Sequence, residues 1–168
     1  MVIHIPGYTT KETIVSSGNT TIFRGIRLSD NCQIIAKLLN REYPSAKELS
    51  VFIREYELLK KIRGDGIIKV YGVEKFQNSL AIILEDIDGQ SVDRIVQSAD
   101  LGISEKLALA IQMTHSIMQI HQQNIIHKDV NPTNFICNRT TNQVKLIDFG
   151  IAAELSREAP QCVNLNIL

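Results

Sequence analysis

The sequence lacks a net charge, a long apolar run and closely spaced cysteines. It has 18 Lys and Arg against 18 Asp and Glu, so its charge does not favour nucleic acid or an anionic membrane as a partner. No apolar run approaches the roughly 20 residues that a membrane-spanning helix needs, and the N-terminus lacks the pattern of a secretory signal. The three cysteines (Cys32, Cys137 and Cys162) are odd in number and far apart, which suits a reducing compartment. We therefore expect a cytoplasmic protein that binds neither nucleic acid nor membrane.

The composition that remains is that of an ordinary globular chain. Of the 168 residues, 44% are hydrophobic and 21% are charged, which argues against intrinsic disorder. The length suits one domain with a sizeable core. The sequence contains no internal repeat and no low-complexity tract, so a repeat architecture is excluded.

The first half of the sequence predicts strands and one helix. Residues 20–28 and 33–39 are β-branched and aliphatic and are separated by a hairpin-type turn. Ser45 is placed to cap a helix, with Glu48 three residues later completing a capping box. Two further strands are expected over residues 67–73 and 80–84.

Beyond residue 89 the pattern becomes mainly helical. Residues 106–122 predict one long amphipathic helix. A polar loop follows at residues 127–134, with short strands expected over residues 135–137 and 144–147. The sequence thus predicts an α+β fold whose elements are segregated into a strand-rich part and a helical part, joined near residues 85–89.

The residues most able to do chemistry lie in the polar loop and after the last expected strand. The loop is His-Lys-Asp-Val-Asn-Pro-Thr-Asn (residues 127–134), and Asp-Phe-Gly follows at residues 148–150. An Asp and an Asn that offer oxygen ligands can share Mg²⁺ or Mn²⁺ when phosphates already hold part of the ion. The remaining carboxylate, Asp129, can then accept a proton from an attacking hydroxyl.

With these two motifs the chain resembles the protein kinase family, with Lys128 and Val130 in place of the usual Arg and Leu. The resemblance implies a protein-kinase-like, two-lobe α+β fold. Residues 1–84 would form an N-lobe with a five-stranded sheet and one helix, residues 85–90 the hinge, and residues 91–168 a partial C-lobe. The motifs look most like the Ser/Thr kinase domain of large bacterial multi-sensor signalling proteins, whose downstream sensor or ATPase domains would be partners.

The resemblance also implies the ligands and the residues that bind them. ATP and Mg²⁺, with Mn²⁺ as an alternative ion, would be the cofactors, and a protein Ser or Thr hydroxyl the phosphate acceptor. Asp129 would accept the hydroxyl proton, and Lys37 would position the α- and β-phosphates while Glu55 (or, less favoured, Glu57) holds it. Asn134 and Asp148 would bind the metal. The nucleotide-binding set comprises Val15, Ser17, Gly18, Ala36, Lys37, Leu84, Glu85, Ile87, Asn134 and Asp148.

Several departures from the family pattern keep a second function open. Val15, Ser17 and Thr20 stand where the glycine-rich loop would carry glycines, and Asn131 stands where a lysine usually contacts the transferred phosphate. No Ala-Pro-Glu motif follows Gly150, so we expect a domain truncated after the Asp-Phe-Gly motif, with an uncovered apolar face that favours self-association. The alternative function is a catalytically silent, pseudokinase-like module that binds nucleotide or a signalling partner. A small-molecule phosphotransferase is a weaker third reading.

Overall fold

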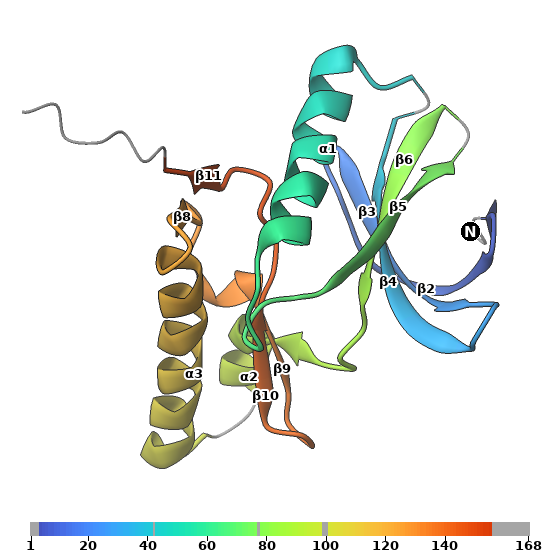
Figure 1. Cartoon of the computed structure of the whole chain (residues 1–168). Helices are drawn as coiled ribbons and strands as arrows, with labels where there is room; N and C mark the ends of the chain where they lie inside the picture. The colour runs from blue at the N-terminus through green and yellow to red at the C-terminus, as the bar shows by residue number, and fades with distance from the viewer. Residues whose placement is uncertain (1–3, 42, 77, 99–100, 156–168) are drawn as a thin grey trace, which may run out of the picture.

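The computed structural model describes residues 4–41, 43–76, 78–98 and 101–155. Strands β1 to β6 and helix α1 gather on one side of the molecule, and α2, α3 and the short strands β7 to β11 on the other (Figure 1). The elements in chain order are β1 (His4–Ile5), β2 (Tyr8–Ser17), β3 (Thr20–Arg27), β4 (Cys32–Leu39), α1 (Ala46–Lys61), β5 (Val70–Phe76), β6 (Ser79–Glu85), β7 (Gln90–Ser91), α2 (Val92–Ser98), α3 (Ile103–His121), β8 (Ile125–Ile126), the 3-10 helix η1 (Pro132–Asn134), β9 (Phe135–Asn138), β10 (Gln143–Leu146) and β11 (Ala153–Glu154).

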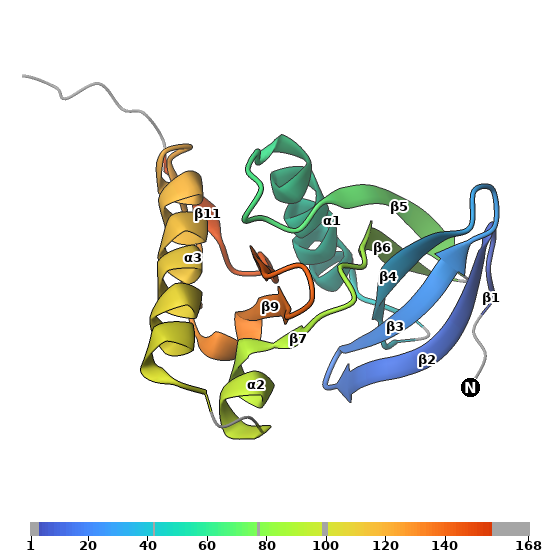
Figure 2. The ribbon, with the colours of Figure 1, turned by 90° about the horizontal axis from the view of Figure 1, so that it is seen from below.

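The large sheet is antiparallel and curls so that its two edges meet. Its strand order is β1-β2-β3-β4-β6-β5, so the five expected strands are present and the two-residue β1 adds a sixth at one edge. The edge strands β1 and β5 are in contact, and the Tyr8 hydroxyl on β2 donates to a Glu74 carboxylate oxygen on β5 at 3.4 Å. Figure 2 shows β1 and β2 on the side of the sheet away from α1.

Alternate residues of the central strands pack into two different cores. In β4, Ile34, Ala36 and Leu38 belong to a cluster on the face away from α1. Ile35 and Leu39 instead pack against the larger cluster, which includes Phe52 of α1. Because side chains alternate between the faces of a strand, Lys37 lies on the same side as Ile35 and Leu39. The period-two pattern of the sequence therefore decides which face of the sheet carries the lysine.

The helix α1 begins as the sequence predicts. The Glu48 backbone N–H donates to the Ser45 hydroxyl at 3.3 Å, and the Ser45 N–H donates to the Glu48 carboxylate at 2.9 Å. This reciprocal capping box satisfies two of the N–H groups that a helix start leaves free. The buried face of α1 carries Phe52, Glu55, Leu58 and Leu59.

The strand predicted over residues 67–73 begins later, at Val70. Ile67 and Ile68 leave the sheet and pair with Leu146 instead, through a parallel bridge and through a bond from the Ile68 N–H to the Leu146 carbonyl at 3.1 Å. Their apolar side chains are 3% and 6% exposed and belong to the larger core. The segment over residues 67–73 thus contacts β10 with its first residues and joins the large sheet only from Val70 onward. The apolar pattern alone does not show where this change occurs.

The long helix is also present, but it starts three residues earlier than predicted and spans Ile103–His121. Glu105 accounts for the earlier start, because its carboxylate accepts the Gly102 backbone N–H at 3.0 Å. Leu109, Ser116 and Ile120 of α3 are buried. Large apolar side chains on another face of the helix are exposed, namely Ile103, Leu107, Ile111 and Met118.

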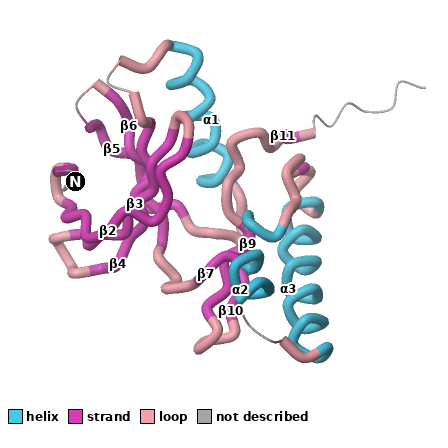
Figure 3. The backbone as a smooth tube through the Cα atoms, turned by 180° about the vertical axis from the view of Figure 1, so that it is seen from behind, coloured by secondary structure: helices cyan, strands magenta, loops and turns pink. Residues whose placement is uncertain are grey.

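One hydrophobic core joins the two sides of the molecule. Its members include Ile82 and Leu84 on β6, Ile120 on α3 and Phe149 after β10. Seen from behind, the strands of the large sheet lie on one side and helices α2 and α3 on the other, with β7, β9 and β10 between (Figure 3). Among the described residues, no helix is long and apolar enough to cross a membrane.

Candidate active site

Lys37 forms the centre of a buried network of charges. Its ammonium nitrogen lies 2.7 Å and 2.9 Å from the two carboxylate oxygens of Glu55, and 2.9 Å from Asp148 Oδ1. Lys37 is 8% exposed and Glu55 4% exposed. Glu57, the alternative partner considered above, lies on the exposed side of α1. The structure therefore brings together Lys37, Glu55 and Asp148 from β4, α1 and the end of β10.

The charges in this network shift one another's pKa values. Burial lowers the pKa of Lys37, but the negative charges of Glu55 and Asp148 outweigh that effect and raise it overall. Burial would raise the pKa of Asp148, yet its contact with the Lys37 ammonium holds that pKa below its usual value. Burial raises the pKa of Glu55, and the nearby charge of Asp148 adds to the rise. The Lys37 ammonium thus lies between two carboxylates and contacts both of them.

Two amides hold the carboxylate of Asp129. The Asn134 side-chain amide donates to Asp129 Oδ2 at 2.9 Å and to the Asp129 carbonyl at 2.9 Å. The Asn131 amide donates to Asp129 Oδ1 at 3.0 Å, and its own oxygen accepts the Thr133 N–H at 3.0 Å, which caps η1. Asp129 itself is exposed and Asn134 is buried. The polar loop therefore presents one oriented carboxylate to solvent.

The backbone around these residues is in a sparsely populated conformation. Lys128 has a φ of 68° and Asp148 a φ of 62°, both in the left-handed region that non-glycine residues rarely occupy. Contacts of the buried His127 support this geometry, because they join the segment before Lys128 to the residues on either side of Asp148. His127 Nε2 lies 3.0 Å from the Ile147 carbonyl oxygen, and the His127 and Phe149 rings meet edge-on with their centroids 4.8 Å apart. Such strain persists only where the surroundings determine it, and it is common at functional sites.

Asn134 and Asp148 are the residues expected to bind a metal. The Asn134 amide nitrogen is used by Asp129, and Asp148 Oδ1 by Lys37, so the ligand atoms left for a cation are the amide oxygen and the second carboxylate oxygen. The described residues contain no group of three His, Cys, Asp or Glu side chains placed to hold a metal. Two oxygen ligands suit a hard divalent ion that phosphates and water also coordinate.

The expected hinge (residues 85–90) begins at Glu85, the last residue of β6. Leu84, the residue before it, is 8% exposed within the large core. The Glu85 carboxylate has two donors outside the network of Lys37. It accepts the Lys145 ammonium at 2.6 Å and the Lys69 N–H at 2.6 Å. The Glu85 side chain is therefore held by β10 and by the segment before β5.

The residues expected above the nucleotide lie on the β2–β3 hairpin. Val15 pairs with Ile22 and Ser17 with Thr20, and Gly18 and Asn19 form the turn. Gly18 has a φ of 49°, and nothing lies within 4 Å of the position that a Cβ would take. The glycine is needed there for its backbone conformation and not for close packing. Ala36, the remaining candidate, is fully buried on the face of β4 opposite Lys37, within the cluster away from α1. The prediction that its side chain joins Lys37 in one site is therefore wrong, because side chains alternate between the faces of a strand.

Sequence reasoning did not single out Lys145 or Arg24. Lys145 is 2% exposed on β10, and Arg24 on β3 pairs with Asp86 in the expected hinge. The only signal for Lys145 is a lysine within an otherwise aliphatic strand, and Arg24 has none.

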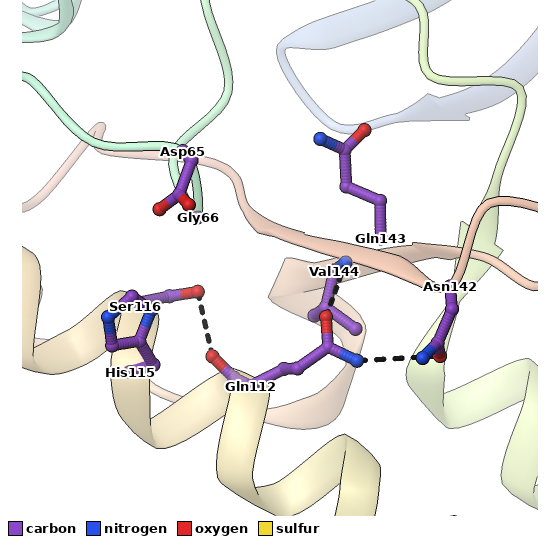
Figure 4. Close-up of a pocket in the computed structure, with 8 residues that line it drawn as sticks. All are labelled: Asp65, Gly66, Gln112, His115, Ser116, Asn142, Gln143 and Val144. Carbon is purple, nitrogen blue, oxygen red and sulfur yellow. Dashed lines mark hydrogen bonds between the residues drawn. The ribbon is translucent and has the colours of Figure 1, made fainter.

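A separate cavity lies between α3, the turn at Asp65 and Gly66, and the start of β10 (Figure 4). Its volume is roughly 160 Å³, and it contains none of the candidate site residues. Gln112 spans it, because its amide oxygen accepts the Val144 N–H at 3.2 Å and its amide nitrogen donates to Asn142 at 3.5 Å. The Ser116 hydroxyl donates to the Gln112 carbonyl at 3.0 Å. These bonds make the cavity a polar junction between elements, distinct from the candidate active site.

The fold and the network together define a protein kinase domain. The family model described as "Protein kinase domain" matches residues 8–165. The chain belongs to the protein kinase family. The narrower resemblance to bacterial multi-sensor proteins stays a prediction.

Individual relatives are serine/threonine and MAP-kinase-cascade kinases by name. MAP3K epsilon protein kinase 1 of Arabidopsis thaliana is 27% identical over 138 residues, covering 80% of this chain and 10% of the relative. A probable serine/threonine-protein kinase of Dictyostelium discoideum is 26% identical over 94% of this chain and 32% of its own length. A MAP kinase kinase of Saccharomyces cerevisiae is 32% identical over 74% of this chain and 19% of its length. The chain thus spans between a tenth and a third of these three relatives.

Proposed function

We propose that this chain binds ATP with Mg²⁺ between its two lobes and transfers the γ-phosphate to a Ser or Thr hydroxyl of a protein. The observation that carries the proposal is the position of Lys37, whose ammonium is held between Glu55 on α1 and Asp148 after β10. Because Glu55 and Asp148 both hold the Lys37 ammonium, its charge lies at one defined point. Phosphoryl transfer depends mainly on such positioning and on charge stabilisation.

The proposed roles follow from the contacts of each side chain. Lys37 binds the α- and β-phosphates while Glu55 orients it. Asp129, held by Asn131 and Asn134, orients the acceptor hydroxyl and takes its proton as the oxygen forms a bond to the γ-phosphorus. The bond from that phosphorus to the β-bridging oxygen breaks, and ADP leaves. Asn134 and Asp148 would hold Mg²⁺, with Mn²⁺ as an alternative, and the ion supplies neutralisation of phosphate charge.

The nucleotide would lie under the β2–β3 hairpin. Val15, Ser17 and Gly18 would cover the phosphates, Leu84 would flank the base, and the backbone at Glu85 and Ile87 would bind its edge. We propose the boundaries of residues 1–84, 85–90 and 91–168 for the first lobe, the hinge and the partial second lobe. We also propose a cytoplasmic location.

The decisive experiment is a phosphotransfer assay with radiolabelled ATP, Mg²⁺ and a generic protein substrate. We expect label to reach Ser or Thr in the wild-type chain. Asp129→Asn should lower kcat by roughly a hundredfold or more, as general-base losses do, while leaving the Kd for Mg·ATP nearly unchanged. Glu57→Gln is the control, because Glu57 is an exposed carboxylate to which the proposal gives no role, so its variant should keep wild-type turnover. Equal turnover in Asp129→Asn and wild type would contradict the proposal.

The second candidate function is a silent nucleotide-binding or interaction module. Asn131 favours it, because its amide occupies one oxygen of Asp129 and brings no cation to the site. Saturable Mg·ATP binding without phosphotransfer would favour this function.

The exposed apolar face of α3 (Ile103, Leu107, Ile111 and Met118) supports a protein partner there, such as a downstream sensor or ATPase domain or a second copy. Light scattering tests self-association.

A further inference from the structure

Arg24 joins the β2–β3 hairpin to the hinge. Its Nε lies 2.5 Å from Asp86 Oδ2, and its Nη2 lies 3.3 Å from Asp86 Oδ1. The side chain of Asp86 is 3% exposed and that of Arg24 is 27% exposed. A two-point contact between a planar guanidinium and a carboxylate fixes orientation as well as distance. The pair connects residues 62 positions apart in the sequence.

The carboxylate of Asp86 also determines the course of the hinge. Its Oδ1 accepts the Asp88 backbone N–H at 2.8 Å, and Asp88 has a φ of 50°, in the left-handed region. The Asp88 carboxylate lies 3.8 Å from Arg24 Nη2. The turn just beyond Ile87 is therefore built around the same carboxylate that binds Arg24.

Arg24, which lies on β3, also contacts β2, the other strand of the hairpin. Arg24 Nη1 lies 3.1 Å from Glu12 on β2. A register shift between Thr10 and Glu12 places Glu12 opposite Arg24, and such bulges bend a strand. Beside them, a Cβ on Gly25 would lie 2.5 Å from the Thr9 carbonyl oxygen, so only glycine allows the two strands to approach this closely. Arg24 thus contacts both strands of the hairpin and the hinge.

We propose that Arg24 is a positioning residue for the nucleotide site. It holds the β2–β3 hairpin, which would cover the phosphates, at a fixed place relative to the hinge, which would bind the adenine. The inference rests on the proposed function. A hairpin whose tip has one glycine, Gly18, has less backbone freedom to close on a ligand than a glycine-rich loop has. A hairpin placed in advance by Arg24 offers the nucleotide a preformed site instead.

The test compares Arg24→Met and Asp86→Asn with Arg27→Met as the matched control. Arg27 lies on the same strand, is also 27% exposed and also forms a close ion pair, but with Asp30 in the adjoining turn. The first measurement is hydrogen exchange of the apo chain over residues 85–89 and 15–22. The second is the Kd and KM for Mg·ATP together with kcat.

We expect faster exchange at both segments in Arg24→Met and Asp86→Asn, and wild-type exchange in Arg27→Met. In the same two variants, the Kd and KM for Mg·ATP should rise about fivefold or more, which is the lower end of the effect that coupled sites have on each other's affinity. The kcat should change little, because the lost contacts act on nucleotide binding. Wild-type exchange in both hinge variants, or equal effects in Arg27→Met, would overturn the inference. If the wild-type chain binds no nucleotide, the proposed function fails, and hydrogen exchange alone still decides whether Arg24 fixes the hairpin to the hinge.

Discussion

Lys145 donates to Glu85 across the boundary between the two lobes, with its ammonium nitrogen 2.6 Å from Glu85 Oε1. Lys145 lies on β10, which leads to Asp148, and Glu85 is the last residue of β6. The same ammonium also donates to the Ile67 carbonyl at 3.3 Å. One buried cation therefore connects the end of the large sheet, the segment before β5 and the strand that precedes the Asp-Phe-Gly motif.

We predict that Lys145→Met destabilises the chain by about 3 kcal/mol, because it leaves Glu85 charged and without its main partner in a buried place. The double variant Lys145→Met/Glu85→Gln should recover part of that loss. Urea unfolding monitored by circular dichroism measures both. Lys75→Met, at an exposed lysine of β5, is the control and should change stability by less than about 0.5 kcal/mol. Equal losses at the two lysines would contradict the prediction.

The turn before β5 is packed so closely on α3 that it admits only glycine. A Cβ on Gly66 would lie 2.4 Å from the Ser116 hydroxyl and 3.1 Å from the Ser116 Cα. We therefore predict that Gly66→Ala costs about 1–3 kcal/mol through overpacking. Gly72 on β5 has nothing within 4 Å of its Cβ position, so Gly72→Ala should be neutral or stabilising by up to about 1 kcal/mol. Thermal unfolding of the two variants checks the contrast, and a similar loss in both would contradict it.

The acid dependence of stability should change in Asp148→Asn. The pKa of Asp148 in the folded chain is lowered from 3.8, with the contact to Lys37 outweighing the opposing effect of burial. As the pH falls through 3.8, the unfolded chain takes up the proton first, so the stabilisation by this carboxylate is present above 3.8 and disappears toward the lower folded value. The variant should therefore lose less stability than wild type below pH 4.

Urea unfolding at intervals between pH 3 and pH 6 measures this difference. Glu57→Gln, at an exposed carboxylate of α1, is the control and should retain the wild-type slope. A wild-type slope in Asp148→Asn as well would show that the Lys37 contact contributes little to stability.

How much of this structure the sequence predicts depends on how local each cause is. The capping box of α1 and the alternation of β4 arise within a few residues, so the position of Lys37 facing α1 follows from the pattern around it. Lys145 and Arg24 are different, because their partners lie 60 and 62 residues away. A lysine in a strand is expected to face solvent, and only the packing of β10 against the end of β6 reverses that expectation.

The candidate site shows the same division. The motifs at residues 127–134 and 148–150 are local and were sufficient to propose Asp129, Asn134 and Asp148. The two amides on Asp129 were not predicted, since Asn131 was considered only as the loss of a cation. Its amide in fact holds Asp129 Oδ1 and its oxygen caps η1.

The last prediction concerns this residue. The family resemblance implies that a lysine at position 131 would contact the transferred phosphate, so Asn131→Lys should raise kcat by roughly tenfold through added charge stabilisation in the transition state. The same change removes the cap of η1 and should lower stability by about 1 kcal/mol. Steady-state kinetics and urea unfolding measure the two effects separately. Asn131→Gln is the control, because it lacks the cation and should not raise kcat. A gain in Asn131→Gln, or an Asn131→Lys chain with unchanged kcat at intact folding, would mean that charge at this position does not limit phosphotransfer.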